Sequence, residues 1–254
     1  MAINKVSIGS LLDDRYEIKR ILEAGSDTAR YEGWHKRVQK KILIQEVDLQ
    51  KEEIEEILFR ARQLGDFSDL PGLCHVSDQF EYGDKAYIIY DYPEGISLEQ
   101  YVGQKKRISE EELTEMFLPV LRNLQKLQNA GIRNLTVSTK MLYRNENGEL
   151  CLVPKIVDYE ADDVEYTYSV CEIFYECLSG KKPQDIFVRV LFDETEPLET
   201  CDPKGSAEFH KIVEKGMNTD SECGFHTPEE LYEALDNWKK DNIKQKGNSL
   251  YLIG

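Results

Sequence analysis

The sequence predicts an α+β protein of two lobes, a β-rich N-terminal lobe followed by an α-helical C-terminal lobe. Residues 1–92 carry strand-like patterns, and the residues after Pro93-Glu94-Gly95 carry helix-like ones. This order is typical of α+β proteins, and a cleft between two lobes is a common binding site. We therefore assign residues 1–92 to the N-lobe and 93–241 to the C-lobe. Residues 242–254 are expected to form a C-terminal tail or the start of a missing segment.

Three segments of the N-lobe alternate in the manner of strands and are rich in β-branched and aromatic residues: 16–22, 42–47 and 85–92. The segment 51–65 between the last two has a different period. Its apolar residues recur at three- and four-residue spacing, which places one apolar stripe along a helix. The stripe consists of Ile54, Ile57, Leu58, Ala61 and Leu64.

Two pairs in the C-lobe, Ser97 with Gln100 and Ser109 with Glu112, have the spacing of a capping box, which satisfies free amides at a helix start. The second pair opens a long helix in which Pro119 predicts a kink. The remaining C-lobe is expected to contain a short β stretch and then helices around 166–179, 206–217 and 228–240.

The composition limits the class of partner. A formal net charge of −16 disfavours nucleic acid and anionic membrane, because both would repel such a surface. The chain has no run of roughly 18 apolar residues, so no membrane span is predicted, and it has no apolar signal core. The six cysteines form no C-x-x-C pair and the four histidines are scattered, so no zinc site is predicted. We expect buried thiols in a cytoplasmic protein.

Six segments follow one another in a recognisable order: RYEIKRILEAG, KILIQEVD, AYIIYDYPEG with SLEQYV, FLPVLRNLQKLQNAGI, YTYSVCEIFYECLSGKKPQD and TPEELYEALDNW. Together they resemble a eukaryotic-type serine/threonine protein kinase of the bacterial kind across nearly the whole chain. The resemblance implies a two-lobe protein-kinase-like fold. It equates the first three segments with the small lobe and the hinge, and the last three with helices of the large lobe.

The resemblance also shows where the nucleotide-binding residues should lie, and they are degenerate. Of the glycine-rich loop only Gly25 remains; the flanking glycine positions hold Glu23 and Thr28, and Asp27 and Arg30 replace an aromatic residue and a valine. A carboxylate about 6 Å from a phosphate charge costs roughly 2–3 kcal/mol at an effective dielectric near 20. Glu23 and Asp27 therefore disfavour a nucleotide.

The ion pair that holds the phosphates in kinases is missing by the same comparison. Its lysine falls on Gln45 and the glutamate on Arg60. We expect Arg60 to lie on a solvated helix face. Tyr90 falls at the residue that gates the back of the nucleotide pocket, and its ring would narrow that pocket.

The catalytic loop can be aligned in two registers. One places the catalytic base at Thr136 and the metal-binding asparagine at Met141, and the other places them at Asn134 and Thr139. Neither register offers a carboxylate to accept a proton from a substrate hydroxyl. No catalytic residue is therefore predicted.

The metal-binding Asp-Phe-Gly motif also has two registers. Spacing from Gly148 puts its aspartate at Pro154, whereas the string KIVDYE puts it at Asp158, and both stay open. The core-helix aspartate that braces the catalytic loop falls on Tyr166. The buried arginine that pairs with the Ala-Pro-Glu glutamate falls on Gly224.

The activation segment is short and acidic and contains no Ala-Pro-Glu. It is either a solvated loop or a docking patch for a basic partner. Its acidic residues are Asp158, Glu160, Asp162, Asp163 and Glu165.

These losses predict a catalytically inactive kinase-like domain that binds a protein partner, for example a basic protein or an active kinase, and that uses no cofactor and no metal. The alternative is an atypical phosphotransferase or nucleotide sensor that binds metal through Asp158. A third hypothesis is an unrelated α+β protein that mimics the order of the motifs.

Overall fold

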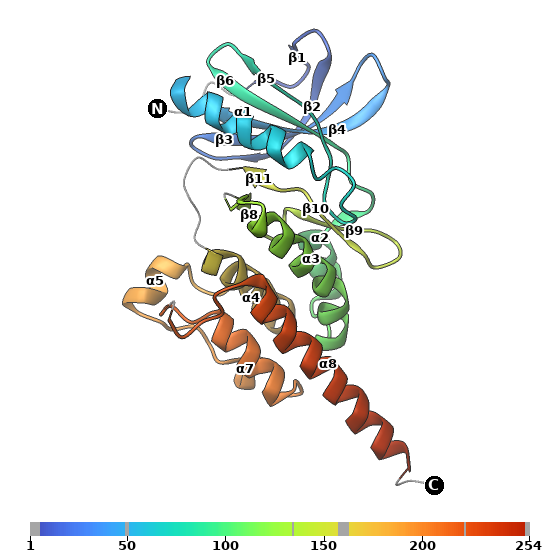
Figure 1. Ribbon diagram of the computed structural model, residues 1–254, viewed down its shortest axis with the longest axis vertical. Helices are drawn as coiled ribbons and strands as arrows, with labels where there is room; N and C mark the ends of the chain where they lie inside the picture. The colour runs from blue at the N-terminus through green and yellow to red at the C-terminus, as the bar shows by residue number, and fades with distance from the viewer. Residues whose placement is uncertain (1–5, 49–50, 134, 157–162, 221, 252–254) are drawn as a thin grey trace. The chain divides into compact units, whose positions relative to one another are not determined.

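The computed structural model describes residues 6–48, 51–133, 135–156, 163–220 and 222–251. The chain divides into two compact units (Figure 1). Unit 1 contains Met1–Glu94, Asn134–Thr136 and Cys151–Glu160, and unit 2 contains Gly95–Arg133, Val137–Leu150 and Ala161–Gly254. The predicted α+β class is confirmed, since the N-terminal unit is built on a sheet and the C-terminal unit on helices.

Unit 1 is organised around a six-stranded antiparallel sheet of order β1-β2-β3-β4-β6-β5. All three predicted strands are present, as β2, β4 and β6, and β1, β3 and β5 complete the sheet. The strands are β1 (Leu11–Leu12), β2 (Tyr16–Ala24), β3 (Thr28–His35), β4 (Lys40–Asp48), β5 (Val76–Tyr82) and β6 (Lys85–Asp91).

Helix α1 (Lys51–Gly65) forms where the apolar stripe predicted it and packs against β5 and β6 (Figure 1). Every residue of that stripe is buried. A second, two-stranded sheet pairs β8 (Leu135–Thr136) with β11 (Lys155–Ile156), so that Thr136 lies opposite Lys155. This small sheet belongs to unit 1 although its strands come from the middle of the chain.

One face of the large sheet buries a carboxylate. Glu46 on β4 is fully buried and accepts hydrogen bonds from the hydroxyls of Tyr31 and Tyr87, at 3.1 Å each. Its other oxygen accepts from Lys85 Nζ at 2.7 Å. Burial, followed by the charge of Glu46, raises the pKa of both tyrosines. The cluster is satisfied internally, as buried polar groups generally are.

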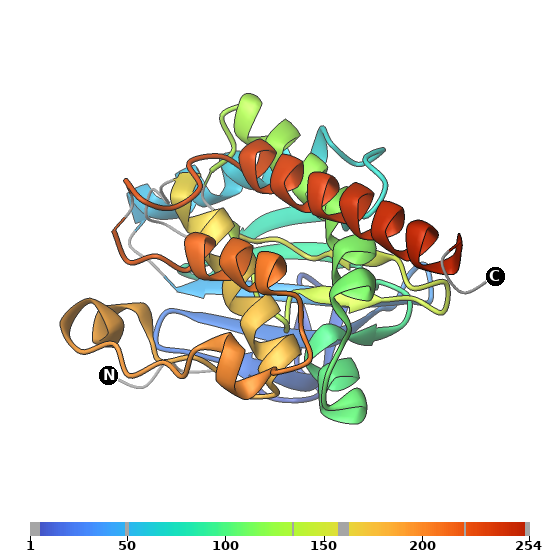
Figure 2. The same cartoon turned by 90° about the horizontal axis from the view of Figure 1, so that it is seen from below.

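Unit 2 is mainly helical. In Figure 2, α8 runs beside α3, and α4 lies next to α7, in agreement with the contacts between these helices. The helices are α2 (Leu98–Lys105), α3 (Glu110–Asn129), α4 (Asp163–Ser179), α5 (Ile186–Leu191), α6 (Leu198–Cys201), α7 (Ala207–Gly216) and α8 (Pro228–Tyr251). Short strands β7 (Ile96–Ser97) and β9 (Leu142–Arg144) pair antiparallel, and β10 (Leu150–Leu152) lies where the chain returns to unit 1.

The helix starts follow the sequence. Ser97 and Gln100 form both hydrogen bonds of the predicted capping box. Ser109 accepts from the amide of Glu112 and so caps α3, whose residues Glu110–Asn129 include Pro119. The assigned boundary at residue 241 falls inside α8, which continues as a helix to Tyr251. None of the helices in the described ranges is long and apolar enough to span a membrane.

Candidate functional site

Gln45 occupies the β4 position at which the kinase resemblance places the phosphate-binding lysine. Its side chain is buried, and its amide both donates a hydrogen bond to the backbone of Ile156 on β11 and accepts one from it. Nε2 donates to the carbonyl of Ile156 at 2.7 Å, and Oε1 accepts from the amide of Ile156 at 3.2 Å. A side chain that could otherwise face a ligand is therefore engaged in holding a strand.

Tyr90, on the neighbouring strand β6, lies fully buried on the same network. Its hydroxyl donates to the carbonyl of Pro154 at 2.7 Å and lies 3.3 Å from Gln45 Oε1. Burial raises the pKa of this hydroxyl, so it stays neutral and can donate. The buried ring therefore lies with its hydroxyl beside Gln45, at the position for which we predicted a gating residue.

The region that resembles the glycine-rich loop is a tight hairpin between β2 and β3. The amide of Gly25 donates to the carbonyl of Thr28 at 2.8 Å, and the carbonyl of Asp27 accepts from Asp48 at 2.8 Å. Phosphate-binding loops work by pointing free backbone amides at the phosphates. The Gly25 amide is instead used within the hairpin, and Gly25 has no positive φ.

Arg30 on β3 lies between two cross-strand neighbours. It pairs with Glu23 on β2 and with Gln45 on β4. Its side chain is buried. The guanidinium is 3.9 Å from the Glu23 carboxylate. The Arg30 cation therefore lies beside Gln45, and Glu23 faces that cation. The kinase resemblance implies an apolar residue under the adenine at the position of Arg30.

The expectation that Arg60 lies on a solvated helix face is wrong. Its side chain is only 16% exposed, and it forms an ion pair with Glu56 one turn earlier in α1. The i,i+4 spacing of Glu56 and Arg60 is the sequence signal for this pairing along the helix.

Two positions that the registers assign to the metal-binding asparagine are described in the segment that resembles the catalytic loop, and both hold buried, neutral side chains. Met141, the position of the metal-binding asparagine in one register, is buried, as is Thr139 in the other. The backbone of Thr136 lies in β8, and Asn134 lies outside the described residues. Neither described side chain is a carboxylate, which agrees with the composition of the segment.

Tyr166, near the start of α4, lies at the position where the kinase resemblance places an aspartate that braces the catalytic loop. It is buried, and its hydroxyl donates to the backbone carbonyl of Arg133. An aspartate at this position could only accept hydrogen bonds, whereas the tyrosine donates one. The hydrogen bond at this position therefore runs from the side chain to the backbone, the opposite direction to that of an aspartate. Next to it, Thr167 donates to the carbonyl of Phe225 at 2.8 Å, beside Gly224.

The residues of the predicted metal site and acidic patch lie mostly outside the described part of the chain. Asp158, Glu160 and Asp162 fall in the range 157–162, which is not described, and nothing is described of the side chains of Asp163 and Glu165. Pro154, the aspartate position in the other register, is buried and offers only its carbonyl, which Tyr90 uses.

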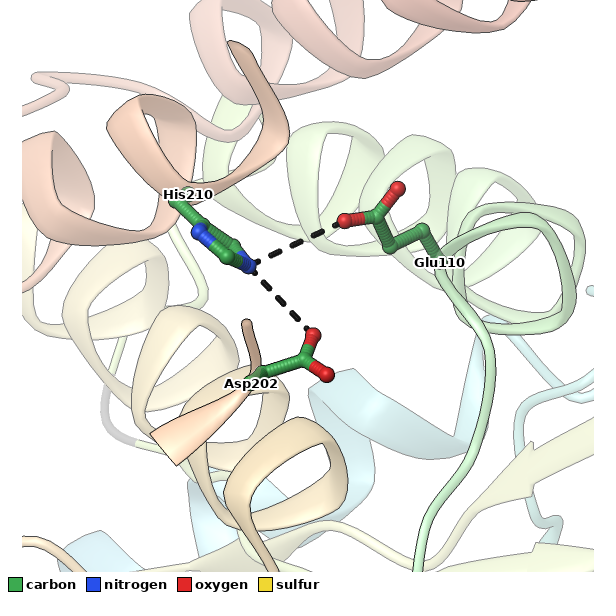
Figure 3. Close-up of side chains that lie close together, drawn as sticks. All are labelled: Glu110, Asp202 and His210. Atoms are coloured by element: carbon green, nitrogen blue, oxygen red, sulfur yellow. Dashed lines mark hydrogen bonds and ion pairs between the residues drawn. The ribbon is translucent and has the colours of Figure 1, made fainter. Parts of the chain in front are cut away.

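A three-residue cluster that the sequence did not predict lies in unit 2, where Glu110, Asp202 and His210 converge (Figure 3). His210 Nε2 is 3.3 Å from Asp202 Oδ2 and 3.9 Å from Glu110 Oε1. Glu110 Oε1 also accepts from the amide of Ser206 at 2.6 Å, and burial raises the pKa of Glu110.

The donor set of this cluster suits a transition metal, and Gly205 packs closely against the donors. A Cβ on Gly205 would lie 2.2 Å from His210 Nε2, 2.5 Å from Asp202 Oδ2 and 2.9 Å from Glu110 Oε1. The Cα of Gly205 thus lies against the centre of the cluster. In this conformation Glu110 of α3 and His210 of α7 meet Asp202, the residue that follows α6, beside Gly205.

Comparison with curated proteins agrees with the sequence resemblance. The chain is 20% identical over 276 aligned residues to a "probable serine/threonine-protein kinase" of Clostridium perfringens, covering 92% of this chain and 40% of that protein. It is 21% identical over 158 residues to the "probable serine/threonine-protein kinase PknB" of Lactococcus lactis, covering 61% of this chain and 25% of that protein. No protein-family model matches.

The chain therefore spans less than half the length of these relatives, and the similarity extends over most of the chain itself. Together with the sheet-based N-terminal unit and the helical C-terminal unit, this similarity identifies a protein-kinase-like fold.

Proposed function

We propose that the chain is a catalytically inactive protein-kinase-like domain that acts in the cytoplasm as a protein-binding, scaffold or allosteric module in signalling. Its partner would be a protein, for example a basic protein or an active kinase. It would use neither a nucleotide nor a metal ion.

The observation that carries the proposal is the pair of hydrogen bonds between Gln45 and Ile156. Phosphoryl transfer depends on positive charge that neutralises the phosphates as charge shifts in the transition state. Gln45 is neutral, and both atoms of its amide are engaged with backbone. To reach a phosphate, the side chain would have to leave Ile156 and abandon two hydrogen bonds at a buried site, a cost of about 2–4 kcal/mol.

Three further positions support the same proposal. Arg60 pairs with Glu56 on its own helix. Met141 is a buried thioether rather than a metal-binding amide. Tyr166 has replaced a carboxylate and makes a hydrogen bond that a carboxylate could not make. Each substitution is accommodated by local contacts, as expected of a fold retained for binding.

The experiment is a pair of measurements on the purified chain. Thermal melting is recorded with millimolar ATP, GTP or ADP, each with Mg²⁺ or Mn²⁺, and transfer of labelled γ-phosphate is measured against a heat-killed control. We expect no shift in melting temperature and no transfer above the control. Transfer to any acceptor would overturn the proposal.

The alternative nucleotide-binding function is tested in the same assay with Asp158→Ala. If a nucleotide stabilises the unmodified chain and this stabilisation disappears in Asp158→Ala, the chain is a nucleotide sensor or an atypical phosphotransferase. Asp69→Ala, at an exposed position of unit 1, is the matched control and should melt like the unmodified chain in every condition.

A further inference from the structure

Helix α5 presents apolar side chains to solvent. None of its residues is fully buried, and the apolar side chains between Phe187 and Phe192 are largely exposed. Phe187 is 80% exposed, Leu191 73% and Phe192 76%. Figures 1 and 2 both show α5 at the end of a loop that projects from α4 and α7. We call Phe187, Val188, Val190, Leu191 and Phe192 the α5 patch.

The helix is held in this orientation by its one charged residue. Arg189 is turned inward, with only 9% of its side chain exposed. Its guanidinium donates to the hydroxyl of Tyr168 on α4 at 2.9 Å and to the carbonyl of Met217 at 2.8 Å. It also forms a two-pronged ion pair with Asp193, at 3.1 and 2.8 Å.

This arrangement reverses ordinary amphipathicity, in which apolar side chains face the core and charged ones face water. Collapse of the apolar residues onto unit 2 would require Arg189 to give up its hydrogen bonds to Tyr168 and Met217, and buried charges are costly to leave without hydrogen-bond partners. The Asp185 side chain additionally caps the helix by accepting from the amide of Phe187 at 2.9 Å. The outward direction of the patch is therefore built into the local structure.

The size of the α5 patch fits the centre of an interface. A phenylalanine carries roughly 150–250 Å² of surface, so Phe187 and Phe192 alone expose a few hundred Å². The largest apolar patch on a typical monomer is about 300–600 Å² and is often a binding site. A stable protein–protein interface needs about 800 Å² from each partner, so further contacts must surround these rings.

The charges around the patch indicate what surrounds it. Carboxylates stand at both ends of the helix, with Asp185 before it and Asp193 and Glu194 after it. Within this group Arg189 pairs with Asp193, and Lys181 pairs with Glu196 at 2.5 Å. Asp185 and Glu194 therefore place a carboxylate at each end of the patch, with the exposed Lys182 three residues before Asp185, on a chain of net charge −16. A second copy would bring the same carboxylates to the contact and would be repelled.

From the inward Arg189, the exposed rings and the carboxylates at both ends, we infer that the α5 patch is the docking surface for an amphipathic helix of a partner protein. The apolar stripe of that helix packs on Phe187, Leu191 and Phe192. Lysines or arginines on either side of the stripe meet Asp185 and Glu194. This inference rests on the proposed binding function and names the surface and the chemistry of the partner. Docking of an amphipathic helix through an apolar stripe is a recurrent mode of recognition.

The probe is a library of helical peptides displayed on phage, with randomised exposed positions, selected on the full chain. The double variant Phe187→Gln/Phe192→Gln serves for counter-selection. Enriched peptides are then synthesised, and their affinity is measured by fluorescence anisotropy at low and high salt. Asp185→Asn/Glu194→Gln tests the charges, because asparagine retains the helix cap. Phe59→Gln removes an exposed ring of α1, at 55% exposure, and is the control.

We expect enriched peptides with large apolar residues at helical spacing and an excess of Lys and Arg. The double Phe variant should weaken their binding more than about tenfold, as for central interface residues. Asp185→Asn/Glu194→Gln should weaken it at low salt and have less effect at high salt. Phe59→Gln should bind like the unmodified chain, and circular dichroism should show all variants folded.

Three results would overturn the inference. The first is failure to enrich peptides against the counter-selection variant, and the second is enrichment of peptides without basic residues. The third is self-association of the unmodified chain in sedimentation that disappears in the double Phe variant, because the occupant would then be a second copy. Peptides that bind all variants equally would show that α5 is not the docking surface, while the proposed binding function would stand. Phosphate transfer in the assay above would overturn the proposed function without testing the α5 patch.

Discussion

The side-chain amide of Gln45 on β4 holds the backbone of Ile156 on β11 at both its N–H, at 3.2 Å, and its C=O, at 2.7 Å. The two residues are 111 positions apart in the chain, yet both belong to the compact N-terminal unit. A glutamine amide can donate and accept at once, which a lysine ammonium cannot. The amide of Gln45 thus attaches β11 to β4.

The first prediction concerns the replacement of Gln45. Gln45→Met keeps the length of the side chain but removes both hydrogen bonds to buried backbone, so we expect a loss of about 2–4 kcal/mol of unfolding free energy. Gln45→Lys can donate but not accept, and it buries an ammonium, so it should be at least as destabilising. Urea denaturation measures both variants.

Thermal melting of Gln45→Lys with ATP and Mg²⁺ tests whether a lysine at this position creates a nucleotide site. If it did, ATP and Mg²⁺ would stabilise the variant, and we expect no such stabilisation. Gln104→Met, at an exposed position of α2, is the matched control and should change stability by less than about 0.5 kcal/mol. A Gln45→Met variant as stable as this control would contradict the role assigned to the amide.

The second prediction concerns the polarity of the brace at Tyr166. Tyr166→Phe removes only the hydroxyl that donates to Arg133, so it should cost about 1 kcal/mol. Tyr166→Asp would restore the residue that the family resemblance implies. It should be far more destabilising, roughly 3–5 kcal/mol, because a buried carboxylate would face a backbone carbonyl without a donor.

The measurement is again urea denaturation at neutral pH, with Tyr82→Phe as the control for loss of a half-exposed tyrosine hydroxyl. The order of stability should be the unmodified chain, then Tyr166→Phe, then Tyr166→Asp. An aspartate variant as stable as the phenylalanine variant would mean that Arg133 and its neighbours can turn an amide toward this position.

The elements that the sequence predicted are those with local patterns. The capping residues Ser97 and Ser109 lie within four residues of the amides that they satisfy, and the apolar stripe of α1 repeats within one helix. Strand β3 carries no such alternation, because its residues Ala29, Arg30 and Tyr31 are buried in succession. A strand covered on both faces leaves no period-two signal.

The site residues depended on contacts that no local pattern encodes. Ile156 gave no indication that it would meet Gln45, and Glu110 and His210 are separated by most of unit 2. Helix α5 was missed for another reason. Its run of apolar residues resembles a buried segment, and only the tertiary contacts of Arg189 with Tyr168 and Met217 turn that run outward.

The third prediction concerns the buried ion pair of Glu46 and Lys85. Lys85→Met leaves the fully buried carboxylate with its two tyrosine donors but without its cation, and it should cost roughly 3–5 kcal/mol. In the Glu46→Gln background the same change should cost less, because no buried charge remains. A double-mutant cycle should therefore give a coupling energy of about 1–3 kcal/mol.

The surface pair of Lys40 and Asp91, 3.9 Å apart and largely exposed, provides the comparison cycle. Its coupling energy should fall between about 0 and 1 kcal/mol. Equal coupling in the two cycles would show that the Glu46 cluster is open to water and would remove the reason for its large effect.

The last prediction is a pH dependence at the anchor of α5. Hydrogen bonds from Arg189, followed by those from Thr195, lower the pKa of Asp193 from its ordinary 3.8 to about 2. Because the folded-state pKa is the lower one, the ion pair stabilises the folded chain above about pH 4, and this contribution disappears as the pH falls from 3.8 toward 2.

Titration of the Asp193 carboxyl carbon by NMR measures that pKa directly, and Arg189→Lys tests its cause, since lysine keeps the charge but not the planar two-pronged geometry. We expect a midpoint near pH 2 in the unmodified chain and a higher one in Arg189→Lys. Hydrogen exchange of the α5 amides should accelerate in the same variant, because the guanidinium is what attaches this otherwise unburied helix to Tyr168 and Met217. A midpoint near 3.8 in the unmodified chain would mean that Asp193 does not hold Arg189 in place, and the outward direction of the apolar residues would then need another cause.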